Sequence, residues 1–207
     1  MMDGMGIVKG LGVTLKRFAD TYLDDLVWLF KRERRYYSQE GLAHRSSKNV
    51  RGIFTIQYPY EKLPVPEEFR FVPFLVYEEG EDGERKIRCT SCGICAKVCP
   101  SQCIWIERTT DPKTGRPVPE PKEFFIDVDV CMNCGFCAEY CPFDAIKMDH
   151  DYELSVYDRF ANNIYDKDKL LKPVSYYASI RPINYQREET ARQEAVAAKA
   201  ARKKRAA

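Results

Sequence analysis

Histidine is nearly absent from this chain, which has 207 residues and only two histidines, His44 and His150. Histidine is the side chain that most often moves protons near neutral pH, and we interpret both residues as surface residues rather than proton carriers. The sequence also has no glycine-rich loop that would cradle a phosphate, no nucleophile with a base beside it and no paired acids placed in a cleft. We therefore expect no catalytic site in this chain itself.

Long apolar runs and a strong charge imbalance are absent as well. The apolar runs are too short for a transmembrane helix, and the formal net charge of +2 gives no strong signal for a nucleic-acid partner. The N-terminus does not resemble a signal peptide, so reduced thiols are expected rather than disulfides. These absences predict a chain with no membrane-spanning helix, no bound nucleic acid and no disulfide framework.

Cysteine, by contrast, is abundant, and eight of the nine cysteines form two copies of the spacing C-x₂-C-x₂-C-x₃-C-P. The first copy is Cys89, Cys92, Cys95 and Cys99, and the second is Cys131, Cys134, Cys137 and Cys141. Each cysteine of the second copy follows its counterpart by 42 residues. This is the two-cluster ferredoxin pattern, in which the fourth cysteine of each run ligates the cluster of the other run. The sequence therefore predicts two [4Fe-4S] clusters and electron transfer.

The crossed fourth ligand assigns four cysteines to each cluster. The first cluster is expected on Cys89, Cys92, Cys95 and Cys141, and the second on Cys99, Cys131, Cys134 and Cys137. The three residues before each fourth cysteine can complete a helical turn, which Pro100 and Pro142 then end. Gly93 and Gly135 allow a positive φ and a close backbone approach to the cluster. Backbone amides there are expected to donate hydrogen bonds to sulfur.

Zinc is the main alternative occupant, because thiolates in tetrahedral geometry suit zinc as well as iron-sulfur clusters. Zinc sites usually pair C-x₂₋₄-C with a second pair of ligands, and a third cysteine repeated twice does not fit that arrangement. Cys103 lies outside the repeat. The repeat aligns it with Ala145, where only a small residue is needed, so we interpret Cys103 as a buried, inert thiol rather than a ligand.

The residues around the cysteines predict an α+β fold, a pseudo-symmetric bacterial-ferredoxin-like domain over residues 84–150. Short strands are expected at residues 85–87, 104–106, 124–128 and 146–148, and the proline-rich segment 109–122 is expected to be a loop. A region this small buries little apolar surface, so the clusters are also expected to hold the domain together.

Residues 1–37 predict an amphipathic helix. Leu11, Leu15, Phe18 and further apolar residues recur at spacings of three and four, which places them on one helix face. The basic and aromatic residues 31–37 that follow are of the kind found at lipid headgroups. Two interpretations stay open: a helix that lies on a membrane surface, and a helix that packs on a partner protein or on the chain's own core.

Two further regions are expected to contact partner subunits. Residues 38–83 look irregular, and the prolines between positions 59 and 66 favour an extended arm. Residues 151–207 form a long C-terminal tail. Its end, residues 188–207, is rich in strong helix formers with few large apolar residues, so it is either a solvated basic helix or a disordered extension.

Segments outside the cysteine runs carry a family resemblance. Residues 10–16 fit G-x-x-x-T-x-K, residues 55–59 fit T-x-Q-Y-P, and segments between residues 152 and 171 fit Y-E-L-x-x-Y-x-R…Y-x-K…L-L. Together with the cysteine runs, these motifs resemble the two-cluster ferredoxin-type subunit of respiratory complex I, NADH-quinone oxidoreductase subunit I. The resemblance covers most of residues 10–16 and 55–171.

The resemblance implies a relay subunit of a proton-translocating NADH:quinone oxidoreductase. Its two clusters would pass electrons towards the quinone-proximal cluster of a neighbouring subunit. The implied partners are the other peripheral-arm and quinone-site subunits and the membrane surface, reached through the N-terminal helix. No small-molecule substrate is expected on this chain alone. The implied location is peripheral, on the cytoplasmic face of the plasma membrane.

The sequence departs from the family in three places, one of which is the extended C-terminal tail rich in alanine, lysine and arginine. Residues 17–54 are longer than expected, and Phe71 stands where the family usually has a glycine, so the electron donor stays open. Three alternatives also stay open: a soluble two-cluster ferredoxin, the relay subunit of a membrane-bound hydrogenase-type complex, and a zinc-stabilised interaction module.

Overall fold

The computed structural model describes residues 4–31, 34–48, 50–80 and 83–206. The chain divides into two compact units, Met1–Pro64 and Val65–Ala207, and each is described by itself. Within the described ranges, no helix is long and apolar enough to cross a membrane.

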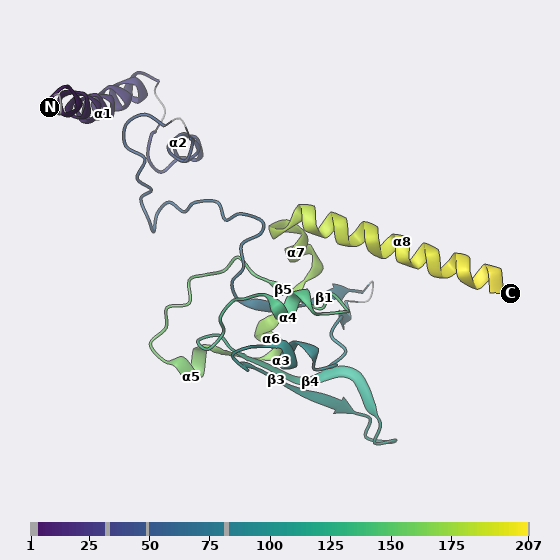
Figure 1. The fold of residues 1–207 in the computed structure, drawn as a ribbon. Coiled ribbons are helices and arrows are strands. Elements are labelled where there is room, and N and C mark those ends of the chain that lie inside the picture. The colour runs from purple at the N-terminus through teal and green to yellow at the C-terminus, as the bar shows by residue number, and fades with distance from the viewer. Residues whose placement is uncertain (1–3, 32–33, 49, 81–82, 207) are drawn as a thin grey trace. The chain divides into compact units, whose positions relative to one another are not determined.

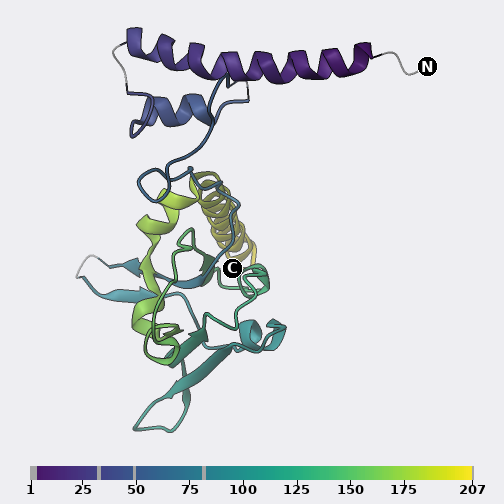
Figure 2. The same cartoon turned by 90° about the vertical axis from the view of Figure 1, so that its left-hand side faces the viewer.

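The N-terminal unit is built on helix α1 (Met5–Phe30), and the chain that follows α1 runs along one side of the C-terminal half of the helix (Figure 2). Asp20, Asp24 and Trp28 are spaced by four residues, share that face and are all at least partly buried. A Cβ at Gly52 would lie 3.0 Å from the Asp24 Cβ and 3.2 Å from the Asp20 carbonyl oxygen. The segment that includes Gly52 therefore passes directly against the helix.

The apolar face of α1 has no such cover within its own unit. Leu11 is 64% exposed, Phe18 is 62% exposed and Phe30 is 80% exposed. Trp28 is the buried residue of α1, and it contacts the His44 ring at 5.3 Å between centroids. Folding thus covers the face around Asp20, Asp24 and Trp28 and leaves the apolar face open, the reverse of a helix that packs its apolar face on its own core.

A second helix, α2 (Gln39–Arg45), stands where an irregular arm was expected, so that expectation is wrong here. Ser38 caps the N-terminus of α2 by accepting a hydrogen bond from the Gly41 N–H at 3.1 Å. Asparagine, aspartate and serine are favoured at this position because their side-chain oxygens satisfy free helix amides. The irregular arm was predicted from the prolines that follow Tyr58. Helix α2 lies before these prolines, so they do not prevent it from forming.

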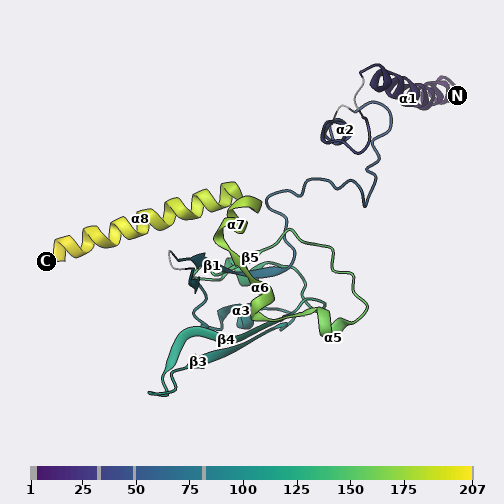
Figure 3. The ribbon, with the colours of Figure 1, turned by 180° about the vertical axis from the view of Figure 1, so that it is seen from behind.

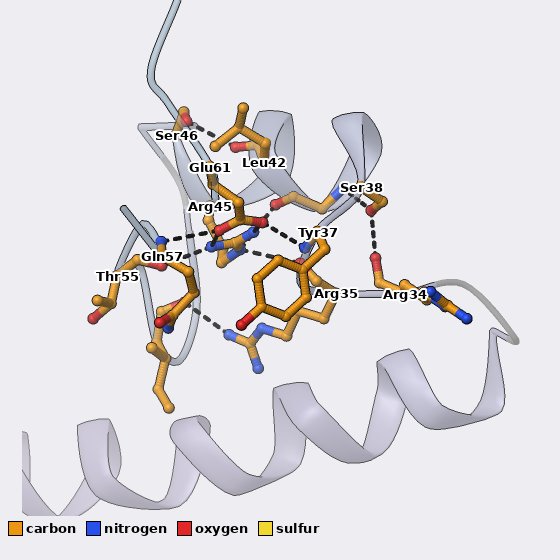
Figure 4. A network of polar contacts seen from close by, with 12 residues as sticks. Arg34, Arg35, Tyr37, Ser38, Leu42, Arg45, Ser46, Thr55, Gln57 and Glu61 are labelled. Atoms are coloured by element: carbon orange, nitrogen blue, oxygen red, sulfur yellow. Dashed lines mark hydrogen bonds and ion pairs between the residues drawn. The ribbon is translucent and has the colours of Figure 1, made fainter. Parts of the chain in front are cut away.

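Arg45 and Glu61 form a buried ion pair that joins α2 to the last residues of the N-terminal unit (Figure 4). The Arg45 side chain is 0% exposed and the Glu61 side chain 4% exposed. Arg45 Nη1 donates to Glu61 Oε2 at 2.7 Å, and the backbone amides of Tyr37 and Gln57 donate to the same carboxylate at 2.6 and 3.0 Å. The Arg45 hydrogen bond is the largest cause that lowers the pKa of Glu61 to about 2.

The second unit holds two sheets (Figure 1). One consists of β1 (Pro73–Glu79), β2 (Arg85–Ile87), β5 (Ile146–Met148) and β7 (Leu171–Pro173). The other has the order β3-β4-β6, with β3 (Ile104–Thr110), β4 (Pro117–Asp127) and β6 (Ile164–Tyr165). The four strands expected around the cysteines are thus confirmed in β2, β3, β4 and β5.

Strand β1 pairs with three other strands and lies in the region expected to be an extended arm. It pairs antiparallel with β2 and β5 and parallel with β7. Phe74 and Val76 pack against Tyr177, whereas Leu75 packs into the cysteine-containing core. Because both faces of β1 are buried, its sequence is a continuous apolar run without the alternation of a half-buried strand. The boundary between the two units therefore falls at residue 64 rather than at residue 83.

The segment 109–122 was expected to be a loop, and this is wrong for most of its length. β3 continues to Thr110 and β4 begins at Pro117, so only a short connection remains. The two strands pair antiparallel with register shifts after Glu107 and Arg108. These irregularities let the prolines stand in β4, since proline cannot donate a ladder hydrogen bond.

The C-terminal segment folds onto the first sheet. After α5 (Arg159–Asn162), α6 (Lys167–Leu170) and β7 come α7 (Val174–Ile180) and α8 (Pro182–Ala206). Lys147 Nζ of β5 contacts the Glu188 carboxylate of α8 at 2.7 Å, and Tyr177 donates to that carboxylate at 2.7 Å. The rest of α8 extends away from the sheets (Figures 1 and 3). Of the two alternatives for the end of the chain, a helix is observed through residue 206.

Glu61→Gln should open the α2 segment of the N-terminal unit. Removing one partner of a buried ion pair leaves Arg45 uncompensated and costs about 3–5 kcal/mol. The pKa of Glu61 is lowered from 4.5 to about 2, so in the wild type this stabilisation is full above about pH 4.5 and is lost as the pH falls towards 2. Hydrogen exchange of residues 39–48 measures the change.

The matched control is Glu40→Gln, which removes the same charge from an exposed position of α2. It should leave hydrogen exchange unchanged, since exposed charges contribute little to stability. Equal exchange rates in both variants would show that the Arg45–Glu61 pair does not hold this unit.

Candidate iron-sulfur centre

The two cysteine runs adopt the same local structure. The first leads into α3 (Ile94–Val98) after Gly93, whose φ is 76°, and the second leads into α4 (Phe136–Glu139) after Gly135, whose φ is 81°. A positive φ is accessible to glycine at little cost. The predicted glycine conformation and the predicted helical turn before each fourth cysteine are both confirmed.

The 42-residue repeat extends to other backbone positions. Ser91 and Asn133 have φ values of 55° and 53°, and Gln102 and Asp144 have values of 54° and 51°. Positive φ is uncommon for residues other than glycine, and here it occurs in pairs at equivalent positions of the repeat. The two halves are thus structural copies of each other and not only copies in sequence.

The Ala145 amide donates a hydrogen bond to the Cys141 sulfur at 3.4 Å. Backbone amides beside four other cysteines also face their thiols: Ser91 at Cys89, Ala96 at Cys95, Asn133 at Cys131 and Ala138 at Cys137. Each of these four amides acts to lower the pKa of its thiol, because an N–H donor favours the thiolate. Such bonds are also one of the factors that set the reduction potential of an iron-sulfur cluster.

The four cysteines expected for the first cluster surround one cavity, which is also lined by Leu75, Ile106, Phe124, Phe143 and Ile146 among others. Burial, followed by the charges of Cys89, Cys141 and Cys92, raises the pKa of Cys95 to about 12. The neighbours of Cys95 are thus the other three members of its expected set, and one of them comes from the second run.

The cysteines expected for the second cluster also lie together. Burial raises the pKa of Cys137 to about 12, with further contributions from the nearby thiols of Cys95, Cys134 and Cys99. Cys131 interacts with both Cys137 and Cys99. Cys95 belongs to the first set, so the two thiol sets are adjacent. The described structure therefore brings all eight predicted residues together in two crossed groups.

Four separate thiols around a cavity suit the corners of a [4Fe-4S] cube, and the amide donors suit its charged sulfurs. All nine cysteines are free thiols. A zinc ion instead draws its ligands to one point. Within the described ranges, no three His, Cys, Asp or Glu side chains are grouped so that they could hold a single metal ion.

Cys103 is buried, as predicted, at 2% exposure, but its surroundings were not foreseen. Its Sγ lies 3.5 Å from the Sγ of Cys99, and a hydrogen bond with Cys131 is the largest cause that raises its pKa. Both neighbours belong to the second expected ligand set. The alignment with Ala145 predicted the size of this residue but not the thiols around it.

The two histidines are less exposed than expected. His150 is half-buried, and its Nε2 lies 3.2 Å from the Glu67 carbonyl oxygen. His44 is half-buried between the Trp28 ring and the Asp24 carboxylate, from which its Nε2 lies 3.5 Å. Both side chains are thus partly exposed and also make local packing contacts.

Two arginines that the sequence analysis did not single out contact the cysteine loops. Arg108 of β3 donates to backbone carbonyls of the first loop, and Arg70, just before β1, donates to the second. Arg70 lies outside the repeat, and its position beside Phe71 gave no sign of this contact.

A protein-family model described as a 4Fe-4S dicluster domain matches residues 88–152. Residues 88–152 form a 4Fe-4S dicluster domain. Its cofactors are two [4Fe-4S] clusters, as the crossed thiol sets predict. The matched residues include β3, β4 and β5, and the remaining strands β1, β2, β6 and β7 come from chain on either side of them.

Curated relatives extend the similarity beyond the dicluster domain. NADH-quinone oxidoreductase subunit I of Methylococcus capsulatus is 44% identical over 117 residues, which are 56% of this chain and 64% of the relative. Subunit I 1 of Nitrosococcus oceani is 43% identical over 117 residues, 56% of this chain and 61% of the relative. Subunit I 2 of Symbiobacterium thermophilum is 40% identical over 104 residues, 50% of this chain and 41% of the relative. The chain spans less than two thirds of each of these relatives.

Among solved structures, a chain of the membrane-bound sulfane sulfur reductase, an archaeal respiratory membrane complex, is 20% identical with a TM-score of 0.41. The match covers 69% of this chain and 66% of that chain. This score is too low to establish a common fold over the matched length.

Stripping iron from the chain by anaerobic chelation should destabilise residues 65–206. Cluster binding contributes directly to folding when the ligands lie in the core, and Cys89, Cys95, Cys99 and Cys137 all lie in the main core. Each kcal/mol lost lowers the melting temperature by about 2–4 °C in a chain of this size, so a decrease of about 10 °C or more is expected. Calorimetry of the loaded and stripped chains measures it, and equal melting temperatures would contradict a structural role.

Proposed function

We propose that this chain is the electron-relay subunit of a membrane-associated, complex I-like NADH-quinone oxidoreductase. Its two [4Fe-4S] clusters pass electrons towards the quinone-proximal cluster of a neighbouring subunit. The observation that carries the proposal is the crossed arrangement of the eight thiols, in a chain whose curated relatives are named as subunit I of such enzymes.

The proposed ligands of the first cluster are Cys89, Cys92, Cys95 and Cys141, and those of the second are Cys99, Cys131, Cys134 and Cys137. When bound, such clusters accept and release single electrons. The residues of the chain hold the thiolates, donate amide hydrogen bonds to them and exclude water with apolar side chains. Cys95 of the first set acts electrostatically on Cys137 of the second, and this proximity supports transfer between the two clusters.

The chain functions within a multi-subunit complex at a membrane in this proposal. Helix α1 supplies the membrane contact on the cytoplasmic face, because its apolar residues remain exposed while the chain covers its polar face. The basic and aromatic segment after α1 was expected to reach the headgroups; residues 32 and 33 of that segment lie outside the described residues. A soluble ferredoxin would have no use for such a helix, so the relay in a membrane complex is the favoured function.

Cys141→Ala should remove or damage the first cluster, because the crossed ligand belongs to the cavity formed with Cys89, Cys92 and Cys95. The matched variant Cys99→Ala should damage the second cluster. EPR spectra of the reduced chain, recorded with iron and acid-labile sulfide analysis, distinguish the two losses. If Cys141→Ala instead removed the cluster of its own run, the ligand assignment would be wrong although the cofactors would stand.

Mild detergent extraction of native membranes should release this chain in a large complex. A native gel with mass spectrometry of the band should find flavin-binding, quinone-site and proton-channel subunits beside it. The presence of an NADH-binding subunit would identify the electron donor. A brown chain of low mass in the soluble fraction would overturn the proposed complex and favour the soluble ferredoxin.

A further inference from the structure

Arg108 holds the first cysteine loop through two backbone carbonyls. Its Nε donates to the Ser91 carbonyl oxygen at 2.7 Å, and its Nη2 donates to the Cys92 carbonyl oxygen at 3.3 Å. Guanidinium groups are well suited to such paired contacts because their N–H donors point in fixed directions. Arg108 stands in β3, so the strand that follows the first run also holds its loop in place.

Arg70 makes the equivalent contact with the second loop. Its Nη1 donates to the Cys134 carbonyl oxygen at 3.0 Å. Cys92 and Cys134 are the second cysteines of their runs and occupy the same position of the 42-residue repeat. Each half therefore has one arginine on the carbonyl of the same cysteine.

The repeat itself does not supply the second arginine. It aligns Arg108 with His150, and the His150 ring contacts the Glu67 carbonyl instead of the loop. Arg70 lies upstream of β1, in a part of the chain without a counterpart in the repeat. The same contact is thus made by residues from two unrelated parts of the chain. The contact is therefore not a by-product of the internal repeat, which indicates that each cysteine loop requires it.

The two arginines also differ in their surroundings. Arg70 forms an ion pair with Glu139 at 2.6 Å and packs over Gly135, where a Cβ would lie 2.8 Å from Arg70 Nη1. At the equivalent Gly93 a Cβ would meet nothing within 4 Å. In the part of the chain that the structure describes, no carboxylate forms an ion pair with Arg108.

We propose that Arg108 and Arg70 are positioning residues that fix the two cluster loops and raise the reduction potential of their own clusters. The inference rests on the proposed function, since it requires both clusters to be bound. Reduction adds one negative charge to a cluster, and a fixed positive charge beside the loop stabilises that reduced state. Glu139 partly cancels the charge of Arg70, so this carboxylate lowers the potential of the second cluster.

A redox titration of the full chain with both clusters tests the proposal, with each cluster followed by its EPR signal. The signals are assigned with the Cys141→Ala and Cys99→Ala variants. Arg108→Gln should shift the midpoint potential of the first cluster to more negative values and leave the second unmoved. Arg70→Gln should shift only the second. The lysine variants, which keep the charge, should restore most of each potential.

Glu139→Gln is the control of opposite sign and should shift the second cluster to more positive values. Potentials that stay unchanged in all these variants, with both clusters present, would overturn the role of the arginines and leave the relay function intact. Wild-type chain that binds no iron and no sulfide would instead overturn the proposed function itself. If a glutamine variant loses its cluster while the matching lysine variant keeps it, the result would support the proposal that the positive charge of the arginine holds the cysteine loop in place.

The glycine pair provides a second test with a matched control. Gly93→Ala and Gly135→Ala share the strain of a positive φ, but only the methyl group added at position 135 would displace Arg70. We therefore expect Gly135→Ala to lower the potential of the second cluster and to cause no further shift in a chain that already carries Arg70→Gln. An equal shift in both backgrounds would show that the effect does not pass through Arg70.

Discussion

The constraint on which the second unit depends is that each group of four thiols draws members from both cysteine runs. Three cysteines of one loop and the fourth of the other must meet around one cavity, so the two loops have to lie side by side. Cys95 and Cys137, one from each set, are close enough to act on each other electrostatically. The same crossing that joins the two halves also keeps the two clusters near each other, as electron transfer between them requires.

Chain outside the repeat completes this small core. Strand β1 contributes Leu75 to the cysteine-containing core and turns Phe74 and Val76 towards Tyr177 of α7. β7 adds a parallel partner to β1, and Arg70 reaches the second loop from just before that strand. Without these segments, the core would lack Leu75 of β1 and the packing of β1 against Tyr177. The Cys134 carbonyl would lack its hydrogen bond from Arg70.

The N-terminal unit follows a different principle. A buried Arg45–Glu61 pair ties α2 to the chain that follows it, and the buried Arg35 side chain, paired with Asp24 at 2.8 Å, holds this chain against α1. The cost of burying charge is offset by hydrogen bonds to both oxygens of the carboxylate. The region 17–54, longer than expected for the family, thus includes chain around Gly52 that lies against Asp20 and Asp24 of the helix, while the apolar side of the helix stays exposed.

Local sequence was enough to predict the two [4Fe-4S] clusters, the positive φ of Gly93 and Gly135 and the four strands around them. Thiolate spacing and glycine conformation are local properties, so they can be read from neighbouring residues. The folded structure was needed to show that β1 belongs to the core, that α2 folds on α1, and that Cys103 and Arg70 lie beside the second loop. These features depend on contacts between residues far apart in the chain, such as Arg70 with Cys134. No local pattern encodes such contacts, because their free energy comes from burial and charge pairing that exist only after folding.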